Sequence, residues 1–123
     1  MTQVNEDNPL LQVTDASFER EVLRSDRPVL VAFWASWNLP SATIIDLLGA
    51  LAPCFKDQLK LALVNVDEAP MCTSHYALTT LPTLCVMADG KLVESQAGLL
   101  DRVSLREVLD RASGQTPIDS QDL

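Results

Sequence analysis

Hydrophobic and polar residues recur with different periods along the chain, and each period predicts a type of secondary structure. Short runs of β-branched and aromatic residues indicate strands buried on both faces, whereas apolar residues three or four positions apart indicate helices. Asp89-Gly90, between two strand-like runs, favours a tight hairpin turn. The pattern predicts strands at 10–14, 29–35, 59–66, 83–88 and 91–95, and helices at 18–23, 40–51, 70–76 and 103–112.

Residues typical of helix ends stand at the borders of these helices. Thr14 or Asp15 is expected to cap the first helix, and Pro40 fits the first turn of the second. Pro53 disturbs or ends that second helix, and Gly114 is placed to stop the last one. The resulting order, β-α-β-α-β-α-β-β-α, predicts a three-layer α/β/α sandwich with a central mixed sheet.

Length and charge limit what the chain can be. Its 123 residues suffice for one domain, predicted at 10–114 between flexible segments at 1–9 and 115–123. The net charge of −8 disfavours nucleic acid and anionic membranes as partners. Apolar runs are strand-sized, far below the ~20 residues of a membrane span. The start of the chain has neither a basic segment nor an apolar signal core, so a cytoplasmic location is expected.

Three cysteines are present without a Cys-x-x-Cys motif, which argues against a disulfide framework. Cys85 is expected to be buried in a strand and Cys54 half-buried at a helix end. Cys72 begins a short helix, where backbone amides could lower its pKa, and it is the one candidate for a reactive thiol. His75 lies three positions further on, but two more ligands are missing, so a solvated histidine, no metal and no cofactor are expected.

The segment at 33–41, Phe-Trp-Ala-Ser-Trp-Asn-Leu-Pro-Ser, resembles the thioredoxin segment Phe-Trp-Ala-x-Trp-Cys-Gly-Pro-Cys. The similarity extends without gaps over roughly residues 10–112 and implies the thioredoxin fold. Further matches are Val13-Thr14-Asp15-Ala16-Ser17-Phe18, Asn65-Val66-Asp67, Tyr76, Leu81-Pro82-Thr83, Asp89-Gly90 and Gly98.

The departures from the thioredoxin pattern concern its chemistry. Asn38 and Ser41 stand where the family has its two redox cysteines, and Leu39 replaces the glycine between them. The family's buried aspartate corresponds to Ala32, and the lysine that pairs with it corresponds to Leu63. Exchange between thiols and disulfides needs an attacking thiolate. The resemblance therefore implies a fold whose redox centre has been lost.

The resemblance also implies a groove that holds an extended peptide, with Leu81 offering its backbone as a strand partner. Pro82 would be the cis-proline of the family, and Trp34 would pack beneath the rim. Trp37 and Leu39 either line this groove or cover the neighbouring loop, and Asn38 and Ser41 either bind peptide or cap the helix. The implied groove residues are Trp37, Asn38, Leu39, Pro40, Leu81, Pro82 and Gly98.

Three functions follow from these observations. The first is a redox-inactive adaptor, assembly factor or chaperone-like protein that binds a protein or extended peptide in the groove. The second is a thiol-disulfide oxidoreductase that works through Cys72 or through a cysteine of a partner. The third is a homodimer joined through the exposed apolar groove, so the expected state is a monomer or a weak homodimer.

Overall fold

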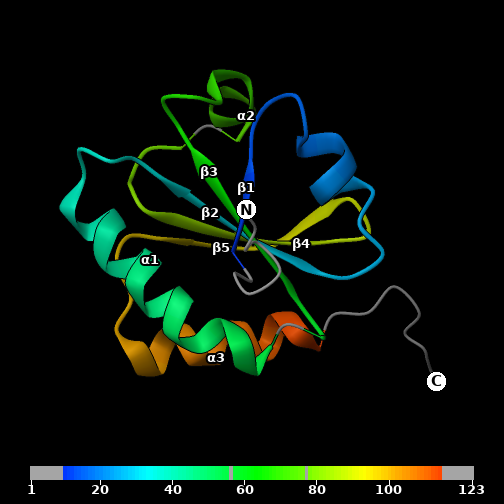
Figure 1. Ribbon diagram of the computed structural model, residues 1–123, viewed down its shortest axis with the longest axis vertical. Coiled ribbons are helices and arrows are strands. Elements are labelled where there is room, and N and C mark those ends of the chain that lie inside the picture. The colour runs from blue at the N-terminus through cyan, green and yellow to red at the C-terminus, as the bar shows by residue number, and fades with distance from the viewer. Residues whose placement is uncertain (1–9, 56, 77, 115–123) are drawn as a thin grey trace, which may run out of the picture.

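A five-stranded mixed sheet forms the middle of the molecule, and helices cover both of its faces (Figure 1). The computed structural model describes residues 10–55, 57–76 and 78–114. The predicted α/β/α architecture is confirmed. The strands are β1 (Leu10–Val13), β2 (Val29–Trp34), β3 (Lys60–Asn65), β4 (Thr83–Ala88) and β5 (Lys91–Ala97), and the helices are η2 (Glu19–Leu23), α1 (Leu39–Leu51), η3 (Ala52–Cys54), α2 (Pro70–His75) and α3 (Arg102–Ser113).

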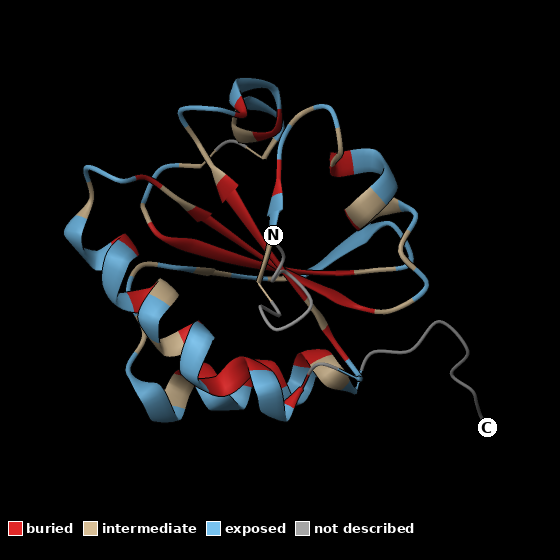
Figure 2. Cartoon of the chain, viewed as in Figure 1, coloured by how far each residue is buried: buried red, intermediate tan, exposed pale blue. Residues whose placement is uncertain are grey.

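The strands lie in the order β1-β3-β2-β4-β5. Strands β1 and β2 run parallel to β3, whereas β4 is antiparallel to β2 and β5 is antiparallel to β4. The three central strands are buried on both faces, while β5 at the edge is largely exposed (Figure 2). This burial explains why the central strands are continuous apolar runs in the sequence.

Two apolar clusters fill the spaces between the sheet and its helices. The α1/α3 face is the side of the sheet covered by α1 and α3, where the helices contribute Ile44, Leu48, Leu105 and Leu109. The α2/η2 face is the opposite side, covered by α2 and η2 (Figure 1). On the first face the sheet contributes Leu30, Ala32, Leu61, Leu63, Leu84 and Val86; on the second it contributes Val13, Val29, Val31, Phe33, Ala62, Val64, Cys85 and Met87.

The first predicted helix differs from expectation. Helix η2 is a single five-residue π-helical turn, and its N-cap residue, Phe18, makes no side-chain cap hydrogen bond. The prediction that Thr14 or Asp15 caps it was wrong. The segment before it forms a turn, in which the Thr14 backbone N–H donates to Ser17 Oγ over 3.1 Å. The Asp15 carboxylate is used elsewhere, because it accepts hydrogen bonds from the start of α2.

The hairpin and the last helix follow the sequence prediction. Asp89 and Gly90 have φ angles of 56° and 77°, as a primed two-residue turn requires. Asp101 caps α3 by accepting a hydrogen bond of 2.8 Å from the Ser104 backbone N–H. Helix α3 ends at Ser113, followed by Gly114 in a right-handed conformation. The flexible segments predicted at 1–9 and 115–123 lie outside the described residues.

Candidate functional site

The carboxamide of Asn38 caps the N-terminus of α1. Its Oδ1 accepts one hydrogen bond of 2.8 Å from the Ser41 backbone N–H and a second of 2.9 Å from Ser41 Oγ. Pro40 lies in the first turn, where a missing N–H costs no helical hydrogen bond. Asn38 is therefore the helix cap, one of the two roles that the sequence left open.

Ser41 connects this cap to the end of β2. Its side chain is fully buried, and its Oγ accepts a 3.3 Å hydrogen bond from the Ala35 backbone N–H while donating to Asn38. The hydroxyl thus has both a donor and an acceptor inside the protein. Its position gives it a structural role, because it satisfies polar groups that would otherwise be buried without partners.

Behind the cap, Ala32 of β2 and Leu63 of β3 lie opposite each other in the parallel register. Both are buried and both belong to the cluster of the α1/α3 face. Trp34 packs against the same cluster, and its Nε1 has no hydrogen-bond partner within the described part of the chain. The space behind α1 is therefore filled by apolar side chains.

Two large apolar side chains at the start of α1 face solvent. Trp37 is 66% exposed and Leu39 is 81% exposed. The Trp37 indole is held in place, since its Nε1 donates a 2.8 Å hydrogen bond to Asp67 Oδ2. Asp67 is itself oriented by a 2.9 Å bond from its backbone N–H to Asn65 Oδ1. Exposed tryptophan in a fixed position is typical of a contact surface.

A cavity of about 390 Å³ opens beside Trp37. It brings together Trp37, Asn38 and Leu81, three of the residues that the sequence suggested for a groove. Leu39, Pro40, Pro82 and Gly98 do not line it. Five further lining residues were not predicted from the sequence, although the Asn65-Val66-Asp67 match contains the first of them; they are Val66, Thr73, Leu78, Thr79 and Thr80.

The segment before β4 forms one wall of this cavity. The Leu81–Pro82 peptide bond is cis, as the resemblance implied. The Pro82 carbonyl accepts a 2.7 Å hydrogen bond from the Gly98 backbone N–H, and Gly98 has a φ of +91° that favours glycine. The Leu81 backbone N–H and carbonyl make no hydrogen bond to another described residue. They remain available to an extended segment placed beside them.

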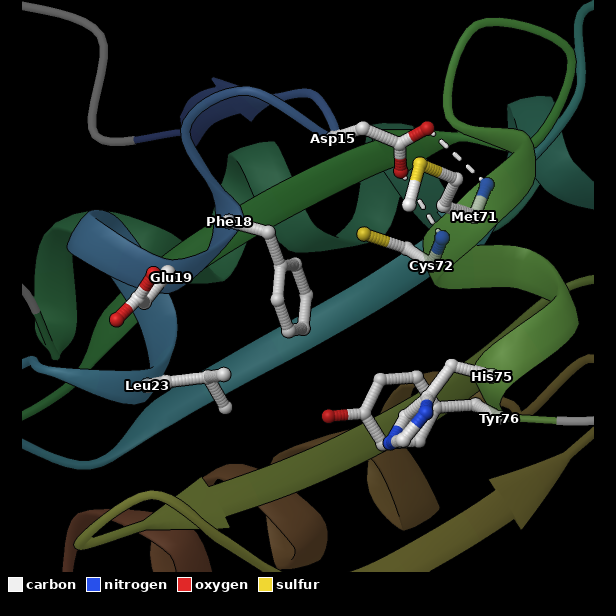
Figure 3. Close-up of a pocket in the computed structure, with 8 residues that line it drawn as sticks. All are labelled: Asp15, Phe18, Glu19, Leu23, Met71, Cys72, His75 and Tyr76. Atoms are coloured by element: carbon white, nitrogen blue, oxygen red, sulfur yellow. Dashed lines mark hydrogen bonds between the residues drawn. The ribbon is translucent and has the colours of Figure 1, made fainter.

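Cys72 lies at a second pocket, between η2 and α2, and the expectation of a lowered pKa there was wrong. The Asp15 carboxylate accepts hydrogen bonds from the backbone N–H groups of Met71 (3.0 Å) and Cys72 (2.9 Å), which joins the two segments (Figure 3). Burial, together with hydrogen bonding and charge from Asp15, raises the pKa of the Cys72 thiol to about 12. Burial of the thiol and the nearby Asp15 carboxylate therefore affect this pKa more than the backbone amides at the start of α2 do.

The remaining candidate groups have simpler surroundings. Cys85 is buried as expected, and burial raises the pKa of its thiol. Cys54, the last residue of η3, was expected to be half-buried but is exposed. His75 is exposed, and its ring packs edge-on against Tyr76 with centroids 4.7 Å apart. Within the ranges that the structure describes, no three His, Cys, Asp or Glu side chains form a group that could hold a metal ion.

Comparison with known proteins identifies the family. The family model for thioredoxin matches residues 9–111. Thioredoxin 1 of Synechococcus elongatus is 39% identical over 99 residues, which cover 80% of this chain and 92% of the relative. A thioredoxin of Acidithiobacillus ferridurans is 41% identical over 101 residues, covering 82% and 94%. A thioredoxin of Rhodospirillum rubrum is 38% identical over 96 residues, covering 78% and 92%. The chain belongs to the thioredoxin family.

The described helices are too short or too polar to span a bilayer.

Proposed function

We propose that this member of the thioredoxin family is a redox-inactive binding module that holds an extended segment of a partner protein. Asn38 and Ser41 carry the proposal, because they occupy the positions at which the thioredoxin pattern has its two redox cysteines. The family's exchange reaction needs sulfur at both positions, and a carboxamide and a buried hydroxyl cannot supply it. The apolar pair Ala32 and Leu63, in place of the family's aspartate and lysine, supports the same conclusion.

The surface around the cavity supports binding of a peptide. Trp37 offers an exposed aromatic side chain in a fixed position, and Leu81, which also lines the cavity, has backbone groups without a hydrogen bond to another described residue. An extended segment could add to Leu81 by backbone hydrogen bonds while an apolar side chain contacts Trp37. An adaptor, an assembly factor and a chaperone-like protein would all use such a surface.

The proposal is tested by affinity capture from a source-cell lysate with the wild-type protein and two leucine variants. Leu81→Glu places a charge in the cavity wall, whereas Leu92→Glu places the same charge on an exposed leucine of the edge strand β5. We expect Leu81→Glu to lose bound protein and Leu92→Glu to retain it. Mass spectrometry then separates a dedicated adaptor, which loses one dominant partner, from a chaperone-like protein, which loses many.

Identical capture by wild type and Leu81→Glu, with both variants folded, would contradict the proposal. A second comparison with Trp37→Ala tests the same cavity at another of its lining residues. Both variants must retain the wild-type circular dichroism spectrum and urea midpoint, so that lost binding reports on the surface and not on unfolding.

A second candidate function is thiol-disulfide oxidoreductase activity, favoured by the fact that the curated relatives are named thioredoxin. In this chain the reaction would need a thiol outside the usual motif, such as Cys72. Its burial and raised pKa oppose that role. Reduction of a protein disulfide is measured for wild type and Cys72→Ala. Turnover by wild type that disappears in the variant would favour the enzyme over the binding module.

The proposal also includes a weak homodimer, since Trp37 and Leu39 are exposed apolar residues at the start of α1. Light scattering over a concentration series distinguishes a monomer from such a dimer. The cytoplasmic location expected from the sequence stays a prediction, which localisation of a fluorescent fusion would test.

A further inference from the structure

Two hydrogen bonds to Asn38 Oδ1 at the start of α1 determine the orientation of the Asn38 carboxamide. The Ser41 backbone N–H is always a donor, so the atom it contacts over 2.8 Å must be the amide oxygen. Ser41 Oγ accepts from Ala35, which leaves its proton for the same oxygen at 2.9 Å. A carboxamide turned by half a rotation would set its NH2 group against a donor. The orientation is therefore fixed by chemistry.

This orientation leaves the Asn38 amide nitrogen free. With the oxygen turned toward Ser41, both N–H donors lie on the other arm of the planar group and have no hydrogen-bond partner among residues 10–114 as described. Asn38 lines the same cavity as Trp37 and Leu81. A polar donor held in place beside an apolar wall fixes the orientation of a ligand.

We propose that Asn38 donates a hydrogen bond to a backbone carbonyl of the bound segment and so sets its register in the cavity. This inference rests on the proposed function. The occupant is an extended peptide because Leu81 lines the cavity and its backbone N–H and carbonyl make no hydrogen bond to another described residue. Carbonyls of an extended segment project alternately to its two sides, so a segment paired with Leu81 also presents carbonyls away from it.

The helix cap is what makes Asn38 suited to this second task. Ser41 binds its oxygen and leaves its nitrogen for the ligand, so one side chain caps the start of the helix and also contacts the peptide. The positions of the family's two cysteines would thus still act together, as a hydrogen-bonded pair that binds without forming a covalent bond.

Two substitutions separate the cap from the donor. Asn38→Asp keeps an oxygen for Ser41 and replaces the donor with an acceptor, whereas Asn38→Ser keeps a cap and removes the second arm altogether. Aspartate, asparagine and serine are similar N-caps, so both variants should unfold in urea near the wild-type midpoint. The probe is a synthetic unstructured peptide selected from a phage-displayed library on the wild-type protein.

Isothermal titration calorimetry of this peptide should show affinity weakened about ten- to a hundredfold in both variants, the range for a hydrogen bond whose partner is left unpaired. Replacing peptide amides one at a time by esters weakens the carbonyl acceptors. One ester should weaken binding to wild type and leave binding to Asn38→Ser unchanged, which identifies the contacted carbonyl.

The controls distinguish this inference from the proposed function. If Leu81→Glu loses the peptide while Asn38→Asp and Asn38→Ser bind it as wild type does, the donor role is wrong and the groove remains. If Leu81→Glu binds the peptide normally, the cavity is not the site and both proposals fall. Equal sensitivity of wild type and Asn38→Ser to every ester would also overturn the donor role.

Discussion

The two faces of the sheet differ in the chemistry of what they bury. The cluster on the α1/α3 face consists of aliphatic side chains and Phe55. The cluster on the α2/η2 face includes Cys72 and Cys85 and packs against Tyr76. Burial raises the pKa of all three groups. The buried cluster of the α1/α3 face therefore contains no titratable side chain, whereas the α2/η2 face contains three groups that keep their protons to a higher pH in the folded protein than in the unfolded one.

The two faces also differ in how they contribute to the candidate site. Val66, Leu78 and Leu81, which line the cavity beside Trp37, pack against the α2/η2 cluster. Ala32 and Leu63 lie on the opposite face, where they fill the space behind α1. The α1/α3 face therefore supports helix α1 from behind, while several residues that line the cavity pack against the cluster of the α2/η2 face. Four predictions test this division.

The largest effect is expected from Ala32→Asp, which puts a carboxyl group into the aliphatic face opposite Leu63. A buried charge without a partner destabilises a protein by about 3–5 kcal/mol. Urea unfolding should show this loss directly. Because Leu63 is the register partner, adding Leu63→Lys to the same chain should recover part of it, with a coupling of about 0.5–3 kcal/mol.

Absence of any recovery would show that this face does not accommodate an aspartate–lysine pair at positions 32 and 63. Leu63→Lys alone is the necessary third corner of the cycle, and it too should be destabilised. Tolerance of Ala32→Asp without loss of stability would contradict the division between the two faces.

The second effect concerns binding and leaves stability nearly unchanged. Trp37→Ala should weaken the affinity for a selected peptide by about 2 kcal/mol or more, as an exposed aromatic contact residue does. The matched control is Val103→Ala, an apolar residue 69% exposed on α3, outside the cavity lining. Calorimetric titration compares the two. Similar losses in both variants would place the contact surface elsewhere.

The third effect is a loss of stability in alkali that originates on the α2/η2 face. An unfolded Cys72 loses its proton near the ordinary pKa of 9.0, while the folded thiol keeps it until about 12. The unfolded state then binds fewer protons, so the free energy of unfolding falls as the pH rises through this window. Urea midpoints between neutral pH and about pH 10 measure the slope.

Cys72→Ala should reduce this alkaline slope. Burial of Cys85 and Tyr76 acts in the same direction, so some slope should remain. An unaltered slope in Cys72→Ala would show that its thiol is not the group that resists deprotonation.

The smallest effect is expected from Asp67→Ala, which removes the acceptor of the Trp37 indole. Surface polar contacts contribute little, so stability should change by no more than about 0.5 kcal/mol. The indole N–H resonance of Trp37 should shift and its motion on the ps–ns timescale should increase in NMR relaxation measurements. An unchanged resonance would mean that Asp67 does not hold the ring.

Much of the fold could be predicted from local pattern. The five strands, the Asp89-Gly90 turn and the approximate bounds of α1, α2 and α3 follow from apolar spacing and end signals. Helix η2 was the exception, because the signal at Asp15 that is typical of a cap serves α2 instead. Such a contact spans more than fifty positions and leaves no local trace in the sequence.

The candidate site, too, could be predicted from the sequence only in part. The sequence by itself determined that sulfur is missing at positions 38 and 41, and that Trp37 and Leu81 belong to the resembling motifs. Residue identity sets which chemistry is available, and no fold can add a thiol. The resemblance, however, suggested seven groove residues, of which three line the cavity.

Tertiary structure decided where each group stands. It buried Cys72 against Asp15 and so raised a pKa that the helix position alone predicts to be low. It also turned the Asn38 oxygen to Ser41 and left the nitrogen beside the cavity. Burial, charge and hydrogen-bond direction depend on neighbours that are distant in the chain. The sequence therefore shows which residue types are present, but it does not predict the environment of each one.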